Sequence, residues 1–415
     1  MTDRRWSVVV AAACVVAGVT GAGGQAIEPR KEFKPNNGCR NGGPGFEPWL
    51  AGFRKEATQK GVSARTISAA LDGMSLDQNI INTDRGQSFF SQSFLSFSDK
   101  LATRNRVDSG QRMIQRQKAT FDRAEKQYGV PAAVITAFWA LESDFGAGMG
   151  KKPVLRSLAT LAWDCRRGEM FREELLAALK IIDRGDLRPA DMIGSWAGEL
   201  GQTQFLPTHY FNYAVDYDGD GRRDLMRSNA DVIGSSANFL AELGWKRGEP
   251  WLEEVRVPAN LKWDQAGLDI QHPRSYWAKA GVTLANGRPL PGDALPGSLL
   301  LLMGRNGPAF MAYPNFQIYL KWNQSLNYAT TAAYLANRIG GAAAMGRGGL
   351  VSVLETNGLK ELQSLLARGG FYQGEQDGRL GAATRAAVKQ AQLKLGMPAD
   401  SYPTADLVER LRGRR

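Results

Sequence analysis

An acidic stretch in the middle of the chain sets the tightest limit on how the chain can fold. It runs from Asp216 to Asp224 and reads Asp-Tyr-Asp-Gly-Asp-Gly-Arg-Arg-Asp. Carboxylates at positions 1, 3 and 5, a glycine at position 6 and a carbonyl at position 7 suit a tight loop around a hard cation such as Ca²⁺. Without a cation, the four aspartates in these nine residues would repel one another. The alternative is a plain turn rich in aspartate and glycine.

The end of this loop departs from the usual calcium-binding pattern. Position 12 is Arg227, where such loops carry a bidentate glutamate. Asp231 follows and is placed to supply the missing oxygen from the start of a helix. The predicted ligands are the carboxylates of Asp216, Asp218, Asp220 and Asp231 and the carbonyl of Arg222. Because Ca²⁺ does little to activate a nucleophile, we expect a structural cation that fixes the chain after residues 202–210.

A single glutamate near the end of an apolar helix is the second feature. Residues 131–146 predict a helix with Pro131 as its first helical residue and Gly146 as its C′ residue. Its apolar residues recur at helical spacing: Val134, Phe138, Leu141 and Phe145. Glu142 lies at the edge of this stripe, where an apolar wall and the negative end of the helix dipole both disfavour an anion. That environment suits a general acid, and the alternative is a surface glutamate paired with a lysine or arginine.

The first 26 residues have the pattern of a secretory signal. Two arginines precede an uncharged run from Ser7 to Ala22, and Ala26 ends a cleavage site of small residues. The run is short for a membrane span, which takes about 20 residues, and no later stretch qualifies. Cys14 lies within the run, but a lipid anchor there is disfavoured because Ala11 stands where leucine is usual.

The cysteines and histidines that remain exclude several classes of site. Cys39 and Cys165 would either form one disulfide, tying a mobile N-terminal arm of residues 27–45 to the main domain, or stay as buried thiols. With only His209 and His272, a Ser-His-Asp or Cys-His hydrolase and a histidine-based zinc site are disfavoured. A net charge of +11 attracts anionic polymers. However, the chain lacks zinc-finger spacing and an RNP signature, so we expect no nucleic acid partner.

The rest of the sequence predicts a mainly helical protein with a small β region. Helical spacing recurs over 46–130, where 112–128 is a charged helical segment that we expect to end at Tyr128-Gly129, and over 154–163, 169–184 and 325–339. An Arg305-Asn306-Gly307 turn between two apolar runs predicts a hairpin inside a β region of about 251–320. Composition predicts a linker at 341–354 and a small helical module after it. The run 191–206 is rich in small residues, which predicts close packing between helices or against a ligand.

These segments resemble, in the same order, the lytic murein transglycosylases of the B type. The motifs are Glu142-Ser-Asp-Phe-Gly146, Gly194-Ser195-Trp-Ala-Gly198, Gly201-Gln-Thr-Gln204-Phe-Leu-Pro207, the acidic loop, Ala237-Asn238, Gly244-Trp245 and Trp322-Asn323 through Tyr328. The resemblance implies a lysozyme-like α+β catalytic domain at 46–340 with an EF-hand-like loop. The tail at 355–412 resembles a three-helix peptidoglycan-binding domain.

The resemblance also implies a reaction. A carbon–oxygen lyase of this family cleaves the β-1,4 bond between N-acetylmuramic acid and N-acetylglucosamine in peptidoglycan and leaves 1,6-anhydro ends. Glu142 would act first as acid and then as base, because the sugar's own 6-hydroxyl replaces a second carboxylate. No organic cofactor is implied. The residues placed at sugar contacts are Ser195, Gln204, Trp322, Asn323 and Tyr328.

Four positions depart from the family pattern. Glu199 stands where a small residue is more common, so the alternative function is a peptidoglycan hydrolase (muramidase) that uses Glu199 as a second carboxylate. Phe239 and Trp322 stand where tyrosine can occur, and Trp322 would stack on a sugar face. Ala391 replaces a commonly aromatic residue of the tail. We expect a periplasmic monomer that acts on glycan strands, and cell-envelope protein partners stay open.

Overall fold

The computed structural model describes residues 36, 38, 39, 41, 45–86, 92–349, 351 and 353–413. The predicted signal segment, with Cys14, and most of the predicted arm lie outside the described residues. The described chain forms two compact units. Unit 1 takes its residues from Met1–Ser88, Asp108–Arg247 and Lys321–Gln324, and unit 2 from Phe89–Val107, Gly248–Leu320 and Ser325–Arg415. The predicted fold class, mainly helical with a small sheet and a helical C-terminal module, is confirmed.

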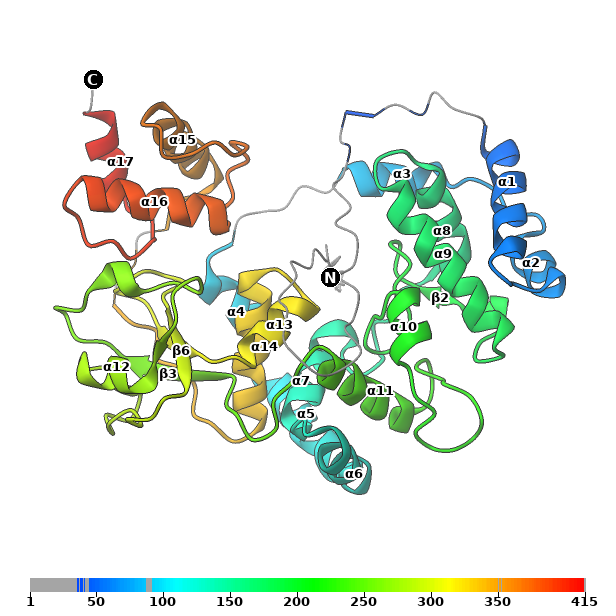
Figure 1. The fold of residues 1–415 in the computed structure, drawn as a ribbon, viewed down its shortest axis with the longest axis horizontal. Coiled ribbons are helices and arrows are strands. Elements are labelled where there is room, and N and C mark those ends of the chain that lie inside the picture. Colours follow the sequence, from blue (N-terminus) through cyan, green and yellow to red (C-terminus); the bar gives the residue numbers. More distant parts are fainter. Residues whose placement is uncertain are drawn as a thin grey trace, which may run out of the picture. The chain divides into compact units, whose positions relative to one another are not determined.

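Unit 1 is built from helices and one two-stranded sheet. Its helices are α1 (Phe46–Gln59), α2 (Ala64–Leu71), α3 (Gln78–Arg85), α6 (Lys118–Tyr128), α7 (Ala132–Ser143), α8 (Val154–Trp163), α9 (Gly168–Asp183), α10 (Pro207–Tyr213) and α11 (Asn229–Glu242). Strand β1 (Lys152–Pro153) pairs antiparallel with β2 (Ile193–Gly194). Helices α8 and α9 pack side by side (Figure 1) and confirm the helices predicted over 154–163 and 169–184.

The charged segment 112–128 is helical on both sides of one break, and its predicted end at Tyr128-Gly129 is confirmed, because α6 ends at Tyr128 and Gly129 is left-handed, with φ 75°. The chain forms α5 (Arg104–Arg116), which spans the boundary between the units, and then α6. Gln117 separates them with φ −108° and ψ 24°. Its carbonyl accepts the N–H groups of Thr120 and Phe121, both at 3.0 Å, so a new helix begins there. No glycine or proline marks the break, which is why the helical spacing runs through it.

Helix α7 is the buried centre of unit 1. Every residue from Val134 to Leu141 is buried, so the helix is apolar on all faces. Pro131 is the N-cap rather than the first helical residue. Gly146 is not the C′ residue, because the helix already ends at Ser143 and Asp144 turns left-handed, with φ 48°. The hydroxyl of Ser143 accepts the N–H of Gly146 at 2.8 Å, which stabilises this earlier ending.

Unit 2 contains the β region, which forms one five-stranded antiparallel sheet. The strand order is β4-β6-β7-β3-β5. The strands are β3 (Leu252–Arg256), β4 (His272–Pro273), β5 (Thr283–Leu284), β6 (Pro296–Leu300) and β7 (Ala309–Ala312). The predicted hairpin is confirmed by the pairing of β6 with β7. Its connection is longer than a two-residue Asn-Gly turn, and the left-handed residue is Gly304, with φ 71°.

Further helices complete unit 2. They are α4 (Phe94–Leu101), α12 (Arg274–Lys279) and α14 (Leu326–Ile339), and α13 (Phe316–Trp322) spans the boundary between the units. Helix α14 confirms the helix predicted over 325–339 and packs against α4. Among the described residues, no helix combines the length and the apolar character that crossing a membrane requires.

The C-terminal module is a three-helix unit that docks on the rest of unit 2. It consists of α15 (Thr356–Arg368), α16 (Ala382–Lys394) and α17 (Ala405–Arg412) (Figure 1). Buried apolar side chains of these helices and their connections form a core of their own. Arg385 of α16 donates to the carbonyl of Leu302 at 2.8 Å, and Lys389 donates to the carbonyl of Ala266 at 2.9 Å. The carboxylate of Asp400 accepts the N–H of Arg305 at 3.0 Å. These bonds hold the module against the β region.

The predicted linker is also held by hydrogen bonds where it is described. Glu254 accepts the N–H of Gly346 at 2.7 Å, and the carbonyl of Asn306 accepts the N–H of Gly349 at 2.7 Å. Arg347 makes two bonds to the carboxylate of Asp99, at 3.0 and 2.9 Å. A composition typical of a flexible connection therefore forms a strap over unit 2.

Candidate active site and cation-binding loop

Glu142 lies half-buried at the end of α7, where it faces a pocket of unit 1. Its Oε1 accepts a hydrogen bond from the indole Nε1 of Trp322 at 3.0 Å. That indole stacks on Phe138, one helical turn before Glu142, with ring centroids 4.2 Å apart. The carboxyl is therefore oriented by an aromatic residue 180 positions further along the chain.

The pocket combines aromatic and polar walls. Its lining residues are Glu142, Glu199, Thr203, Gln204, Phe205, Leu206, His209, Phe239 and Trp322. Phe239 contacts Phe205 and Trp322, with ring centroids 5.2 and 5.4 Å away. An apolar wall lowers the local dielectric constant, which strengthens electrostatic interactions with a reacting group. A carboxyl in this setting can give and take a proton beside a bound ligand.

Glu199 lies in the same pocket, with only 4% of its surface exposed. Arg167, at the start of α9, lies close enough to interact with it. Burial lowers the pKa of Arg167, whereas Asp84 and, less strongly, Glu199 oppose the decrease. The pocket therefore holds a second carboxylate with a guanidinium nearby.

The segment that carries Glu199 folds as tight turns rather than as a helix. Leu200 and Phe205 exchange backbone hydrogen bonds at 2.8 and 2.9 Å. A side chain on Gly194 would clash with the carbonyl of Glu199. The close packing predicted for 191–206 is therefore present, but it joins turns of backbone, and the expectation of packed helices is wrong.

Gln204 is held in an unusual conformation beside the pocket. Its φ of 50° is left-handed, which is uncommon for a residue with a side chain. The side-chain Nε2 donates to the carbonyls of Gly201 at 2.8 Å and Met149 at 3.3 Å. Backbone strain of this kind concentrates at functional sites. The conformation supports a binding role, and the predicted sugar contact of Gln204 stays a prediction.

The other predicted sugar contacts lie in different surroundings. Ser195 is 2% exposed, and its hydroxyl oxygen accepts two backbone N–H groups of its own turn, both at 3.1 Å. Asn323 is 4% exposed and follows Trp322, which donates to the Glu142 carboxyl. Tyr328 belongs to unit 2, in the first turn of α14. Their roles stay predictions, as does the stacking of Trp322 on a sugar.

Four lining residues were not predicted as site residues from the sequence: Thr203, Phe205, Leu206 and His209. Thr203 lies between the two glutamines of the Gly201–Pro207 motif, so the motif itself was a signal for it. His209 follows that motif by two residues and packs on Phe239, with ring centroids 4.7 Å apart. Sequence reasoning considered His209 only as a catalytic base or metal ligand, which hid its place in the wall.

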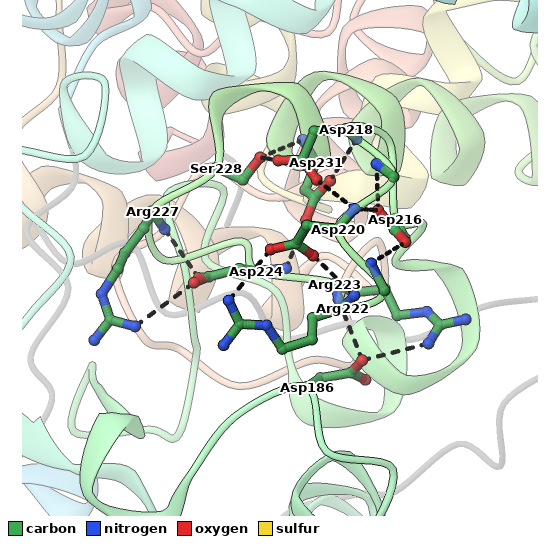
Figure 2. A network of polar contacts seen from close by, with 12 residues as sticks. Asp186, Asp216, Asp218, Asp220, Arg222, Arg223, Asp224, Arg227, Ser228 and Asp231 are labelled. Carbon is green, nitrogen blue, oxygen red and sulfur yellow. Dashed lines mark hydrogen bonds and ion pairs between the residues drawn. The ribbon is translucent and has the colours of Figure 1, made fainter.

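The acidic loop brings three predicted cation ligands together. Asp216, Asp218 and Asp231 each offer a carboxylate oxygen, and these oxygens lie within 4.8 Å of one another (Figure 2). Asp220 is outside this group, and its carboxylate lies 3.2 Å from the guanidinium of Arg222. Three carboxylate oxygens converging on one point form the donor set that Ca²⁺ prefers. The residues present therefore fit a calcium ion.

Backbone N–H groups hold the ligands of this loop in place. Asp231, in the first turn of α11, accepts the N–H groups of Tyr217 and Asp224, both at 2.7 Å. Desolvation raises the pKa of Asp231, and Asp218 adds to the increase, while these N–H groups oppose it. For Asp216 desolvation acts upward as well, but three backbone N–H groups bring its pKa below the usual value. A bound cation would relieve the unfavourable charge on Asp231.

Ion pairs fasten the loop to the rest of unit 1. Figure 2 shows Asp186 beside Arg223, whose backbone N–H it accepts at 3.2 Å. Arg227 lies 2.8 Å from Asp191. These contacts join the loop to the segment after α9, which leads into the turns of the pocket.

Cys39 and Cys165 form a disulfide in the structure, with Cα atoms 6.1 Å apart. That spacing lies within the usual range for a disulfide. The neighbouring Asp164 accepts a hydrogen bond from Arg85 at 2.7 Å. The disulfide joins the described part of the N-terminal arm to the turn between α8 and α9.

Comparison with known families matches most of the chain. A family described as "Transglycosylase SLT domain" matches residues 45–337. A second, described as "Putative peptidoglycan binding domain", matches residues 355–411.

Individual relatives agree with these matches. Membrane-bound lytic murein transglycosylase B of Escherichia coli (strain K12) is 30% identical over 333 residues, which cover 77% of this chain and 89% of that protein. The crystal structure of SltB3 from Pseudomonas aeruginosa with NAG-anhNAM-pentapeptide is 40% identical, with a TM-score of 0.83, and the match covers 89% of this chain and 100% of that one. The structure of Escherichia coli SLT35 with calcium is 28% identical, with a TM-score of 0.61, over 71% of this chain and 93% of that one. The chain thus belongs to the lytic transglycosylase family defined by the SLT domain, and it carries a C-terminal peptidoglycan-binding domain.

Proposed function

We propose that this protein is a lytic transglycosylase. It cleaves the β-1,4 bond between N-acetylmuramic acid and N-acetylglucosamine in peptidoglycan and leaves 1,6-anhydromuramyl ends. The observation that carries the proposal is the Glu142 carboxyl, held by the indole N–H of Trp322 at 3.0 Å in a pocket with an aromatic wall.

The reaction needs one carboxyl that works twice. Protonated Glu142 gives its proton to the glycosidic oxygen as the bond from that oxygen to the anomeric carbon breaks. The resulting carboxylate then takes the proton of the muramic acid 6-hydroxyl, whose oxygen bonds to the anomeric carbon. The nucleophile belongs to the substrate, so its proximity replaces a second side chain. The Trp322 N–H stabilises the carboxylate form between the two steps.

A glutamine at position 142 tests this role. Glu142→Gln keeps the size of the side chain but can neither give nor take the proton. We expect release of fragments from purified peptidoglycan to fall at least a hundredfold, because general acid–base catalysis contributes about that much. Asp144→Asn is a matched control, since Asp144 is exposed and follows the helix end. Digestion at the normal rate by the Glu142→Gln variant would contradict the assignment.

A muramidase is the second candidate function, because Glu199 lines the same pocket. In that reaction Glu199 would activate a water molecule, and the products would carry reducing ends. Product masses separate the two reactions.

We propose further that the acidic loop holds a structural Ca²⁺. The ligand carboxylates would be Asp216, Asp218 and Asp231, with Asp220 and the Arg222 carbonyl as further expected ligands. When bound, the ion neutralises the gathered carboxylates and stiffens the loop. The calcium in the SLT35 structure supports the choice of ion. Isothermal titration of the chelated protein with Ca²⁺ tests it, and no heat of binding would contradict it.

The protein is proposed to act in the periplasm as a monomer, with residues 46–340 as the catalytic domain, 341–354 as the linker and 355–412 as the wall-binding domain. The secretory pattern of the first 26 residues and the Cys39–Cys165 disulfide both suit export to an oxidising compartment. Fractionation of cells that produce the full chain tests the location. Recovery in the cytoplasm at full length would contradict it.

A further inference from the structure

Thr203 lines the pocket, and its buried hydroxyl makes no hydrogen bond to any described residue. The residue is 1% exposed. Buried hydroxyls nearly always have a partner, because an unpaired one has given up its bonds to water without replacement. An unpaired hydroxyl in a ligand pocket therefore calls for an explanation.

The backbone on both sides of Thr203 is fixed. The N–H of Gln202 donates to the carbonyl of Leu225 at 2.9 Å, and the N–H of Gln204 donates to the carbonyl of Gly201 at 3.1 Å. The turn cannot carry the side chain to a distant partner without breaking these bonds. A partner must come to the hydroxyl.

The position of Thr203 indicates what kind of partner that is. It lines the pocket together with the Glu142 carboxyl, while Phe205, Leu206 and Phe239 supply apolar wall. A pyranose ring has apolar faces and a rim of hydroxyl and acetamido groups, so it suits a pocket with both kinds of wall. A threonine hydroxyl donates one hydrogen bond and accepts two, so it can serve a carbonyl, an N–H or another hydroxyl.

We infer that the Thr203 hydroxyl binds a hydroxyl or acetamido group of the amino sugar that sits beside Glu142. This inference rests on the proposed function and adds a substrate-binding residue to it. Thr203 acts on affinity, whereas Glu142 acts on the chemical step.

The test measures affinity without turnover. Thr203→Val, which keeps the shape and removes the hydroxyl, and Thr203→Ser, which keeps the hydroxyl, are each combined with Glu142→Gln. Isothermal titration with a soluble GlcNAc–MurNAc-peptide fragment gives the dissociation constant, and calorimetry gives the melting midpoint. We expect Thr203→Val to weaken binding about three- to tenfold. Thr203→Ser should bind within about twofold of the parent.

The melting midpoint distinguishes a binding role from a structural one. Thr203→Val should melt at the parent's temperature or above it, because it removes an unpaired buried hydroxyl. A clear loss of thermal stability would show that the hydroxyl has a partner in the fold and would overturn the inference. Unchanged affinity in Thr203→Val would overturn it too.

Two further results complete the test. If the Glu142→Gln parent does not bind the fragment, the proposed function itself fails, and the Thr203 inference fails with it. If the valine variant binds more weakly, a fragment without N-acetyl groups locates the contact. If Thr203→Val and the parent bind this second fragment equally well, the contact is with the acetamido group. If Thr203→Val still binds it more weakly, the contact is with a hydroxyl.

Discussion

Replacing Asp231 by asparagine separates two roles of one buried carboxylate. Its Oδ1 accepts the N–H of Tyr217 at 2.7 Å and its Oδ2 accepts the N–H of Asp224 at 2.7 Å, and the residue is fully buried. Asparagine offers one oxygen, so in either orientation an NH₂ group meets one of these buried donors. A buried donor without a partner costs about 1–3 kcal/mol. For a unit of this size that lowers the melting midpoint by roughly 2–4 °C per kcal/mol.

Excess Ca²⁺ should increase the difference in melting midpoint between the unaltered protein and Asp231→Asn. At a free concentration about a hundred times its dissociation constant, an ion bound only to the folded state adds about 2.7 kcal/mol of stability. The unaltered protein should gain this increment when Ca²⁺ replaces chelator, and Asp231→Asn should lose most of it. Differential scanning calorimetry with excess Ca²⁺ and with chelator measures all four midpoints.

The matched control is Asp186→Asn. Asp186 is buried at the foot of the loop and accepts the N–H of Arg223 at 3.2 Å, but it is outside the group of gathered carboxylates. This variant should be less stable with chelator and still gain the calcium increment. If Asp231→Asn gains the full increment, Asp231 is not a ligand. If the unaltered protein melts at the same temperature in both conditions, the structural cation is refuted.

Three further predictions concern other parts of the molecule. Trp322→Phe removes the indole bond to the Glu142 carboxyl and should lower kcat about tenfold. Trp245→Phe, which loses an indole bond to a backbone carbonyl elsewhere in unit 1, should leave kcat unchanged, and equal effects of the two substitutions would contradict the proposed role of Trp322. Burial raises the pKa of Glu254 in the folded protein above its ordinary value of 4.5. The folded protein therefore loses stability relative to the unfolded chain as pH rises from 4.5 through this raised pKa and the carboxyl ionises. The stability of Glu254→Gln minus that of the unaltered protein should therefore increase from pH 4 to pH 7, by less than about 1 kcal/mol because solvent screens a partly exposed carboxyl. Urea unfolding of both proteins at both pH values measures this difference. A difference that is the same at both pH values would contradict the prediction. Asp400→Ala removes the hydrogen-bond acceptor of Arg305, Gln392 and Tyr402, so it should destabilise the docked module by about 2 kcal/mol and speed proteolysis of the linker. Asp406→Ala, at an exposed residue of the same module, should do neither. Equal rates of proteolysis in the two variants would contradict the docking.

Local patterns predicted the main elements and pointed to the two candidate sites. The carboxylate spacing of the acidic loop and the apolar stripe before Glu142 each lie within about a dozen residues, so a window of sequence contains the whole signal. The helices at 154–163 and 169–184 and the hairpin in the β region were predicted for the same reason. Asp231 was expected at the start of a helix, and it lies in the first turn of α11.

The assembly of the pocket could not be predicted in this way. Its walls come from α7, the turns after residue 194, α10, α11 and the end of α13 at Trp322. The hydrogen bond from Trp322 to Glu142 spans 180 positions, and no local pattern predicts it. The resemblance to a family suggested that these residues share one site, but it did not indicate that Trp322 would hold the carboxyl.

One error has a physical cause outside the local sequence. The left-handed ending of α7 at Asp144 depends on Ser143, whose hydroxyl donates to the carbonyl of Gln202. A residue 59 positions away thus decides where the helix ends.

The central claim is that Glu142 works without a carboxylate partner and uses the sugar's own hydroxyl as nucleophile. Mass spectrometry of the fragments released from purified peptidoglycan by the full chain tests it most directly. We predict fragments with anhydromuramyl ends, each one water lighter than the hydrolysis product, and we predict them equally for the unaltered protein and for Glu199→Gln. Fragments that carry only reducing ends would contradict the claim. If Glu199→Gln then failed to release such fragments, Glu199 would be the second carboxylate of a hydrolase.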